Sequence, residues 1–384
     1  MKAPVGSEPM ATVVPFVPPP YPYERLDALK QIADTQPGGV VDCSIGTPCD
    51  PVPDVVAAAA ADAARQSMGY PPSAGTPALH EAAAAWMARR LDVEVAPDHL
   101  AACVGTKEMV VSLPHLLALR DPERDTVLYP AVAYPSYEMG ATLANRRAVA
   151  VPLDAEWHLD LDAIDPADAR RALVLWINEP GNPSSSAADL AYLERVAEWG
   201  RANNVVIASD ECYVEFAPDR NTILRAGPDG VLAVHSLSKR SNLAGMRVGF
   251  YAGDPALVHY LTETRKHAGF MVPTPAQAAA VAAFADDAHV DEQRERYRAR
   301  RDLVMERLAA DGLLHAGGPM LFYLWLRDDH GADGWAMADR LARAGLLVSP
   351  GDLYGDAGAP YARLALVQPL ERLEPALDRL VKGG

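Results

Sequence analysis

The chain carries hydroxyl, amine and guanidinium side chains together in one short segment. Ser236, Ser238 and Lys239 come just after the apolar run 231–234, and Arg247 lies eight residues past the lysine. Hydroxyls, backbone N–H groups and an arginine can hold a phosphate dianion. A lysine at the end of a strand can lose enough hydration to act as a neutral nucleophile. The segment therefore predicts a carbonyl cofactor with a phosphate tail, and pyridoxal 5′-phosphate fits this description.

The alternative for this lysine is an ordinary solvated side chain in a serine-rich turn, because short motifs carry false positives. Only six of the 35 lysines and arginines in the chain are lysines, so its surface charge is mostly arginine. A lysine directly after an apolar run is therefore less expected by chance. The decision depends on whether other reactive side chains fall at the same place in the fold.

From residue 99 onward, short apolar runs alternate with amphipathic stretches, which predicts an α/β sheet with mostly parallel strands and helices on both faces. The predicted strands are residues 100–104, 126–129, 148–152, 172–177, 205–208, 231–234 and 247–252. Ligands of such sheets lie at the carboxyl ends of the strands. Polar segments follow four of these ends, at 105–108, 178–183, 210–213 and Lys239. Each is a weak signal alone, but four at one sheet edge predict a ligand site.

Three further segments add to this prediction. Residues 105–108 open a helix directly after a strand, so their N–H groups and the positive end of the helix dipole can bind phosphate. The short strand 40–45 ends in Gly46, where the backbone can approach a ligand closely, although a plain turn is the alternative. Tyr70 stands in the Pro/Gly loop 69–77, and long loops of this kind tend to be functional. Its phenol can donate to a phosphate or simply pack.

Composition and charge narrow the class of protein. The chain has 384 residues, 49% hydrophobic and 22% charged, which suits a globular protein with one large and one smaller domain. A net charge of −16 argues against nucleic acid and anionic membranes as main partners, because both require a basic face. The four cysteines lack metal-type spacing, so we expect no metal site and a reducing compartment. Prolines interrupt the N-terminal apolar residues, which argues against a signal peptide and favours a cytoplasmic location.

The patterns also predict a division of the chain. Residues 1–22 are proline-rich and predict an extended arm, because proline fixes φ and removes a backbone donor. A single long helix is expected over 276–309, followed by a small α+β unit. The predicted limits are 1–45 for the arm and part of the small domain, 46–275 for the large cofactor-binding domain, and 276–384 for the C-terminal small domain.

Taken together, these motifs resemble those of the class I/II aminotransferases, which are fold-type I pyridoxal-phosphate enzymes, across nearly the whole chain. SLSK followed by an arginine looks like the Schiff-base lysine with its phosphate-binding serine and arginine. SDECY looks like the strand-end aspartate and tyrosine, and NEPGNP like the asparagine–proline motif. The resemblance implies a large α/β domain with a mostly parallel seven-stranded sheet between helices, a smaller α+β domain, and a homodimer with shared active sites.

The resemblance also implies roles for matching residues. Lys239 would carry the cofactor, Asp210 would pair with its pyridine nitrogen, and Tyr213 and Asn182 would reach its phenolic oxygen. These three, Lys239, Asp210 and Tyr213, are the expected catalytic residues. The remaining cofactor-binding residues are expected to be Gly105, Thr106, Lys107, Ser236, Ser238 and Arg247 at the phosphate, Tyr134 on the ring, and Tyr70 from a second subunit. Substrate binding is expected at Gly46, Asn182 and Arg363, with Arg363 holding the α-carboxylate.

Within the family, the chain most resembles the N-succinyl-LL-diaminopimelate aminotransferases, in motifs such as GYPPSAGT, AYPSY, NLAGMR, RKHAGFMVP and PGDLYG. Two segments depart from the family pattern. Residues 184–186 are three serines where threonine and glycine are usual after asparagine–proline, and residues 319–325 are bulky where small residues are usual. The second segment borders the substrate pocket in the family. The substrate assignment is therefore more open than the cofactor assignment.

Three hypotheses for the function remain at this point. The leading one is transamination between an amino acid and a keto acid, with glutamate as amino donor and N-succinyl-diaminopimelate as the favoured substrate. The second is elimination, replacement or carbon–carbon bond formation on a larger amino acid such as S-adenosylmethionine. The third is a non-catalytic binding protein. The joint presence of four residues argues against it: Lys239, Asp210, Tyr213 and Asn182. A distal substrate carboxylate would need a cation, and the candidates are Arg25, Lys266 and His267, which can equally be surface residues.

Overall fold

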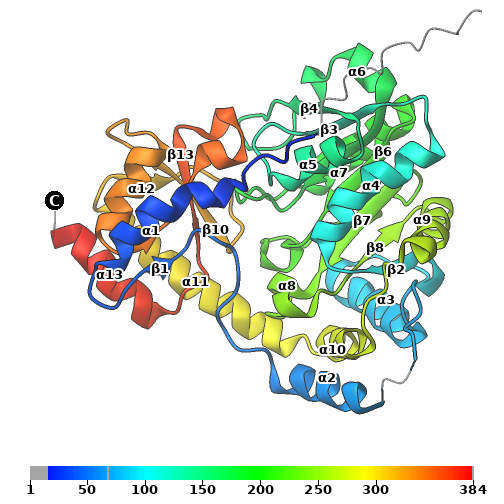
Figure 1. Cartoon of the computed structure of the whole chain (residues 1–384), viewed down its shortest axis with the longest axis horizontal. Coiled ribbons are helices and arrows are strands. Elements are labelled where there is room, and N and C mark those ends of the chain that lie inside the picture. The colour runs from blue at the N-terminus through cyan, green and yellow to red at the C-terminus, as the bar shows by residue number, and fades with distance from the viewer. Residues whose placement is uncertain (1–15, 67–68, 383–384) are drawn as a thin grey trace, which may run out of the picture.

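The structure, a computed structural model, describes residues 16–66 and 69–382. Its largest element is a seven-stranded sheet, which lies beside a smaller sheet unit in Figure 1. Neighbouring strands are parallel except where β8 is involved, because β8 runs against both β2 and β7. The predicted mostly parallel seven-stranded sheet is therefore confirmed. The strand order is β2 (Leu100–Cys103), β8 (Gly249–Gly253), β7 (Val231–Ser236), β6 (Val206–Asp210), β5 (Ala172–Asn178), β3 (Thr126–Pro130) and β4 (Arg147–Val151).

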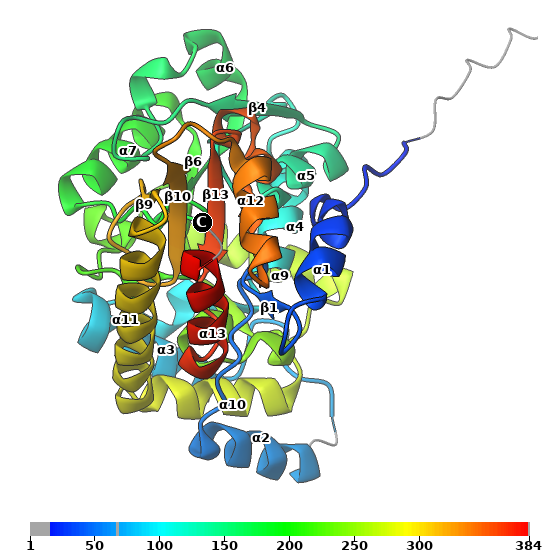
Figure 2. The same ribbon diagram turned by 90° about the vertical axis from the view of Figure 1, so that its left-hand side faces the viewer.

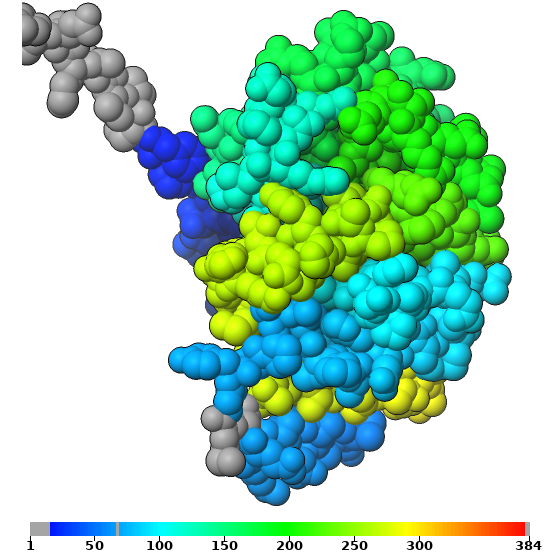
Figure 3. All heavy atoms as spheres, turned by 90° about the vertical axis from the view of Figure 1, so that its right-hand side faces the viewer, coloured from blue at the N-terminus to red at the C-terminus, as the bar shows by residue number. Residues whose placement is uncertain are grey.

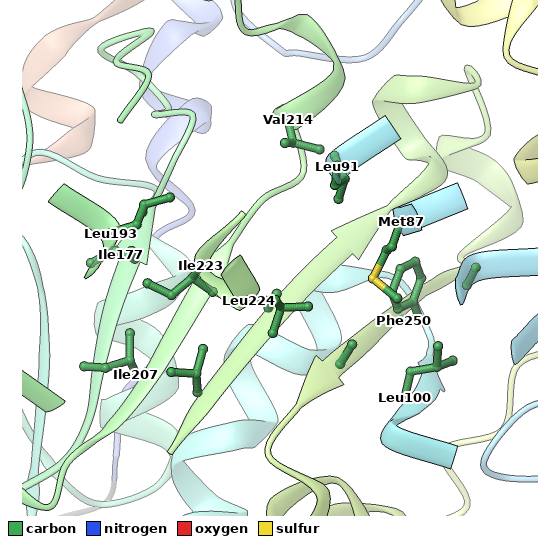
Figure 4. Packing of buried hydrophobic residues seen from close by; sticks show 14 of the residues in the cluster. Met87, Leu91, Leu100, Ile177, Leu193, Ile207, Val214, Ile223, Leu224 and Phe250 are labelled. Atoms are coloured by element: carbon green, nitrogen blue, oxygen red, sulfur yellow. The ribbon is translucent and has the colours of Figure 1, made fainter. Parts of the chain in front are cut away.

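Helices cover both faces of this sheet, as the strand pattern requires. Along β5, Leu175 and Ile177 join one buried apolar cluster, while Val174 and Trp176 join another, because successive side chains point to opposite faces. Figure 4 shows part of the first cluster, where helix and strand side chains interdigitate. Its helices are α2 (Asp54–Gln66), α3 (Pro77–Leu91), α7 (Leu190–Asn203) and α10 (Thr274–Ala285), and those of the second are α4 (Thr106–Arg120), α5 (Ser136–Leu143) and α9 (Pro255–Ala268).

The smaller unit is built on four antiparallel strands, in the order β12 (Ser349–Pro350), β13 (Tyr361–Ala365), β10 (Tyr323–Asp328) and β9 (Leu313–His315). Near the N-terminus, β1 (Val41–Asp42) pairs in parallel with β11 (Leu346–Leu347). In Figure 2, β10 and β13 lie among the helices of this unit. These helices, α1 (Asp27–Asp34), α11 (Ala288–Ala309), α12 (Gly334–Arg343) and α13 (Leu370–Lys382), share one apolar cluster with the strands.

The single helix expected over residues 276–309 is wrong, because the structure has two helices, α10 and α11, in this region. Asp286 lies between them in an extended conformation, with φ −113° and ψ 103°. Its carboxylate accepts a hydrogen bond of 3.0 Å from the backbone N–H of Ala288, and such local bonds compete with helix continuation. Because α10 packs in the cluster of the large sheet and α11 in that of the small unit, we propose the domain boundary between them.

Candidate active site

The strand ends of the large sheet and the strands of the small unit line one cavity of about 400 Å³. This volume is typical of a site for a small molecule. The four strand-end segments that the sequence singles out all reach the cavity, as expected for parallel strands that end at one edge. The predicted residues that line it are Gly46, Thr106, Lys107, Tyr134, Asn182, Asp210, Tyr213, Ser236, Ser238, Lys239, Arg247 and Arg363.

Lys239 enters the cavity from α8 (Leu237–Arg240), the short helix that directly follows β7. Its Nζ donates a hydrogen bond to the carbonyl of Gly46 and lies 5.6 Å from the centre of the Phe322 ring. Burial lowers the pKa of Lys239 to about 8, because the charged amine loses its hydration. Near this pH about half of the side chains are neutral amines, the form that a nucleophile or general base requires.

Asp210 is a buried carboxylate, 7% exposed, at the end of β6. One oxygen accepts a hydrogen bond of 3.0 Å from the Tyr137 hydroxyl, and the other accepts one of 3.2 Å from the backbone N–H of Cys212. Burial raises the pKa of Asp210, and these hydrogen bonds only partly offset the effect. No lysine or arginine of the described residues donates to this carboxylate. A cationic group of a ligand would therefore supply the partner that the buried charge lacks.

Arg363 of β13 meets Asn182 of the loop after β5, although they are 181 positions apart. Its Nη1 donates to Asn182 Oδ1 at 2.8 Å, and its Nη2 donates to the carbonyl of Ser44. The guanidinium lies 4.4 Å and 4.8 Å from the ring centres of Tyr323 and Tyr354. Only 1% of the residue is exposed, yet its Nε finds no hydrogen-bond partner among the described residues. Two aromatic rings and two hydrogen bonds thus hold the guanidinium where it lines the cavity.

Small and hydroxylated residues gather with an arginine at the other end of the cavity. Gly105 caps α4 at φ 72°, and a Cβ there would collide with the guanidinium of Arg247. The glycine therefore lets this arginine lie against the N-terminus of the helix, which begins at Thr106. Ser236 accepts a hydrogen bond of 3.1 Å from the backbone N–H of Ser238. Helix N–H groups, hydroxyls and a guanidinium make this end suitable for a phosphate.

Several cavity residues were not assigned a role from the sequence. The Tyr323 hydroxyl lies 2.9 Å from that of Tyr213, and burial raises the pKa of Tyr323 to about 12, so it stays protonated. Tyr323 stands in the bulky segment 319–325, which the resemblance places beside the substrate pocket, but no motif singles out this tyrosine within it. Asn178 and Cys212 line the cavity, and Tyr137 contacts Asp210 without lining it. They lie inside the motifs NEPGNP, SDECY and AYPSY, where their neighbours were the residues assigned.

The structure keeps some sequence candidates away from the cavity. Tyr70 is 94% exposed, in the loop that projects after residue 68 in Figure 3. Arg25 forms an ion pair of 2.9 Å with Asp352, and Lys266 forms one of 2.5 Å with Glu263. Neither of these cations lines the cavity, and neither does His267. The three candidates for a distal carboxylate are therefore not supported by the geometry of this chain.

The two unusual segments pack against each other, and Tyr323 of the second segment also lines the cavity. The backbone N–H groups of Gly318 and Met320 donate to the carbonyls of Ser184 and Ser185, at 2.9 Å and 3.1 Å. Ser185 has φ 61°, and its hydroxyl donates to the Tyr323 carbonyl at 2.8 Å. Met320 is fully buried in the small unit and does not line the cavity. The segment thus reaches the site through Tyr323 and through Phe322, whose ring centre lies 5.6 Å from Lys239 Nζ.

We expect Ser185→Ala to destabilise the protein by about 1–3 kcal/mol, because it removes a buried hydrogen bond while keeping a side chain at positive φ. Ser185→Gly is the matched control. It loses the same hydrogen bond but relieves the strained backbone, so its loss should be smaller by about 1 kcal/mol. Urea unfolding of both variants measures the difference. Equal stability of the two variants would contradict this account.

A desolvated lysine, a buried aspartate without a cationic partner and a phosphate-binding end define the site of a pyridoxal-phosphate enzyme on an α/β sheet. Comparisons agree with this class. Residues 39–380 match the family model described as aminotransferase class I and II. The chain therefore belongs to the class I and II aminotransferases, which depend on pyridoxal phosphate and have the fold-type I architecture.

Individual relatives show how far the similarity extends. Over 371 residues, the chain is 41% identical to 4-dedimethylamino-4-oxo-anhydrotetracycline transaminase OxyQ of Streptomyces rimosus, covering 94% of this chain and 99% of that protein. It is 33% identical to LL-diaminopimelate aminotransferase of Aquifex aeolicus, with 94% and 96% covered. The structure of a probable N-succinyldiaminopimelate aminotransferase from Thermus thermophilus superposes with a TM-score of 0.85 at 30% identity. The superposition covers 94% of this chain and 100% of that chain.

Proposed function

We propose that this aminotransferase moves an amino group from glutamate to the keto form of N-succinyl-diaminopimelate. The observation that carries the proposal is the placement of Lys239, Asp210 and Arg363 around one cavity, with a phosphate-binding end beside them. The 30% identical solved structure bears the name of an N-succinyldiaminopimelate aminotransferase, which supports the choice of acceptor. The choice of a succinylated acceptor also depends on Lys107, a cation that lines the cavity.

The residues divide the chemical work as follows. When bound, pyridoxal phosphate supplies an electron sink for the charge left on the substrate when Cα loses its proton. Asp210 would hold the protonated pyridine nitrogen, since its buried charge lacks another cation. The neutral amine of Lys239 would take the proton from Cα. Arg363 would hold the α-carboxylate of the substrate through two parallel hydrogen bonds and so fix which face of Cα meets the lysine.

The remaining predicted residues would hold the cofactor. The hydroxyls of Thr106, Ser236 and Ser238 and the guanidinium of Arg247 surround the end of the cavity next to Gly105. These groups would bind the phosphate, and the N–H groups at the start of α4 would add donors. Tyr134 would lie against the ring, and the Tyr213 hydroxyl, held by that of Tyr323, would donate to its phenolic oxygen, together with Asn182.

Lys107 gives the cavity a cation for a distal carboxylate. Its Nζ lies 5.0 Å and 5.9 Å from the ring centres of Tyr21 and Tyr134 and donates to the Tyr21 hydroxyl at 3.5 Å. The contacts of the ammonium are thus with tyrosines, and it forms no ion pair with a carboxylate of the described residues. We propose that the backbone of Lys107 serves the phosphate, while its ammonium binds the far carboxylate of a long substrate.

Replacing Lys107 with methionine tests this role, because methionine keeps the apolar stem and removes the charge. We expect kcat/KM to fall about 10- to 100-fold for the succinylated substrate, since one charge-assisted hydrogen bond is worth about 1.5–3 kcal/mol. For alanine, which has no distal carboxylate, the change should be less than threefold, about the effect of 0.6 kcal/mol. An equal loss for both substrates would place the Lys107 side chain at the cofactor instead.

The second candidate for the acceptor is a polycyclic ketone of the kind that the name of the 41% identical relative describes. The observation that favours it is the open mouth of the cavity, where Tyr21 and Ile45 are 48% and 49% exposed and Tyr23 lies beside them. Elimination, replacement and carbon–carbon bond formation were suggested by the unusual bulk that begins at residue 319. Residues 319–321 do not line the cavity, so this argument for a different reaction is weakened.

The decisive experiment follows the visible absorption of the purified holoenzyme. We expect glutamate alone to convert the absorption to that of the amino form of the cofactor, and the succinylated keto acid to restore it. No change with glutamate would overturn the choice of donor. Restoration by a polycyclic ketone but not by the succinylated keto acid would favour the second acceptor. A slow or irreversible spectral change with S-adenosylmethionine alone would favour the non-transaminase reactions.

We also propose that two copies of the chain share their active sites. Tyr70 is nearly fully exposed here, and Phe16 and Val17, which precede the cavity residue Tyr21, are 57% and 77% exposed. A second copy would bury these apolar groups and bring Tyr70 to the phosphate of its partner. None of the described helices is long and apolar enough to cross a membrane. Light scattering of the purified protein should give a mass near twice 41.1 kDa, and a monomer would refute the shared site.

A further inference from the structure

The helix that carries Lys239 is too short to hold itself in place. α8 has four residues, and a single turn fixes many backbone angles for very few hydrogen bonds. Its position must therefore come from packing and side-chain contacts. Arg240, the last residue of α8, is 2% exposed and points into the protein rather than into the cavity. Adjacent residues of a helix project about 100° apart, so fixing one constrains the direction of the other.

The guanidinium of Arg240 joins α8 to three other segments. Its Nε donates to Glu215 Oε1 at 3.2 Å, in the turn that follows β6. One terminal nitrogen donates to the Ala283 carbonyl of α10 at 2.6 Å, and the other to Asp287 at 3.4 Å, just before α11. The plane of the group also lies against the rings of Trp86 and Phe284, at 5.6 Å and 5.3 Å from their centres.

Glu215 is the fixed anchor of this arrangement. It is 2% exposed and accepts hydrogen bonds from Trp86 Nε1 at 2.8 Å, from Arg90 at 3.0 Å and from Arg220 at 3.0 Å. Although burial raises its pKa, the neighbouring Arg240 and Arg90 bring the pKa below the usual value, so it stays charged. A buried carboxylate held from several helices cannot move without leaving charges unpaired.

We propose that Arg240 is a positioning residue, which fixes α8 through Glu215 and the junction of α10 and α11 so that Lys239 stays in the cavity and away from water. Neither Arg240 nor Glu215 lines the cavity, so the effect is indirect. Through Asp287 and Ala283, the arginine also connects α8 to the junction of α10 and α11, two helices whose buried residues belong to different apolar clusters. The inference rests on the proposed role of Lys239 as the residue that carries the cofactor.

The test uses two variants of Arg240 and one matched control in the holoenzyme. Arg240→Met removes all its polar contacts, while Arg240→Lys keeps a charge beside Glu215 and loses the planar fork. The control is Arg220→Met, because Arg220 donates a hydrogen bond of 3.0 Å to the same Glu215 carboxylate but does not belong to α8. The readout is the pH midpoint of the change in the visible absorption of the bound cofactor, which reports the proton on the Lys239 nitrogen.

Water that reaches a loosened α8 would stabilise the protonated nitrogen, so the midpoint should move upward by about one pH unit in Arg240→Met. A smaller upward shift is expected in Arg240→Lys and none in Arg220→Met. Unchanged midpoints in the folded Arg240→Lys protein, or an equal shift in the control, would overturn the positioning role. Absence of any visible cofactor band in the unaltered protein would instead refute the proposed function, so the two failures are distinguishable.

Discussion

Lys239→Ala is expected to lower kcat for transamination by about 10²- to 10⁴-fold, because it removes the group that would take the proton from Cα. The same change should abolish covalent attachment of pyridoxal phosphate, since alanine has no amine. Stability should not suffer, because the buried Lys239 amine has lost hydration and makes one hydrogen bond, to the Gly46 carbonyl. Stopped-flow absorbance with glutamate measures the rate, and borohydride reduction followed by mass spectrometry measures the attachment.

Lys266→Ala is the matched control for this change. Lys266 is a half-exposed lysine paired with Glu263 on α9, outside the cavity, so its removal should leave both measurements unaltered. Borohydride-stable cofactor on another residue of the Lys239→Ala protein would contradict the assignment. So would a rate within tenfold of the unaltered enzyme, because general base catalysis alone contributes more than that.

Much of the site was predictable because its residues follow strands that the sequence marks clearly. Apolar runs such as 172–177 and 231–234 can only be buried strands in an alternating chain, and parallel strands place their carboxyl ends at one edge. Asp210 and Lys239 were therefore expected at one edge of the sheet, and the structure pairs their strands, β6 and β7, side by side. The sequence also marked Gly105, directly after a strand, and in the structure this glycine leaves room for the guanidinium of Arg247.

Contacts between the two units were not predictable from residue patterns. The bond between Arg363 and Asn182, and the contact of Tyr323 with Tyr213, join segments more than a hundred residues apart. Periodicity shows that a strand is buried but not which partner it meets. The same limit explains the missed break at Asp286, because alanine-rich and charged stretches both favour helix, and the two aspartates between them, Asp286 and Asp287, carry little weight.

These contacts also explain why the three serines and the bulky strand do not imply a new reaction. A serine hydroxyl on the Tyr323 carbonyl and the close approach of Gly317 and Gly318 to residues 184–186 fasten the loop that carries Asn182. In this way the departures from the family pattern support the same pair, Asn182 and Arg363, that would receive the substrate. The proposed contact between Arg363 and the α-carboxylate of the substrate can therefore be tested directly.

Arg363→Lys should lower kcat/KM by about 10- to 100-fold for every α-amino acid tested, with the loss mainly in KM. Lysine keeps the charge but cannot offer two parallel N–H groups, and each charge-assisted bond is worth about 1.5–3 kcal/mol. It also cannot keep both the 2.8 Å bond to Asn182 and the contact with the Ser44 carbonyl. Steady-state kinetics with glutamate, alanine and the succinylated substrate measure the change.

A substrate without the α-carboxylate separates recognition from general damage to the site. We expect the half-reaction with a simple primary amine, slow in the unaltered enzyme, to change less than threefold in Arg363→Lys. Arg327→Lys is the control on the adjacent strand, where the arginine is exposed and paired with Asp329 at 3.2 Å, and it should behave as the unaltered enzyme. If the amine and the amino acids lose the same factor, Arg363 holds the architecture of the cavity, and another group must bind the carboxylate.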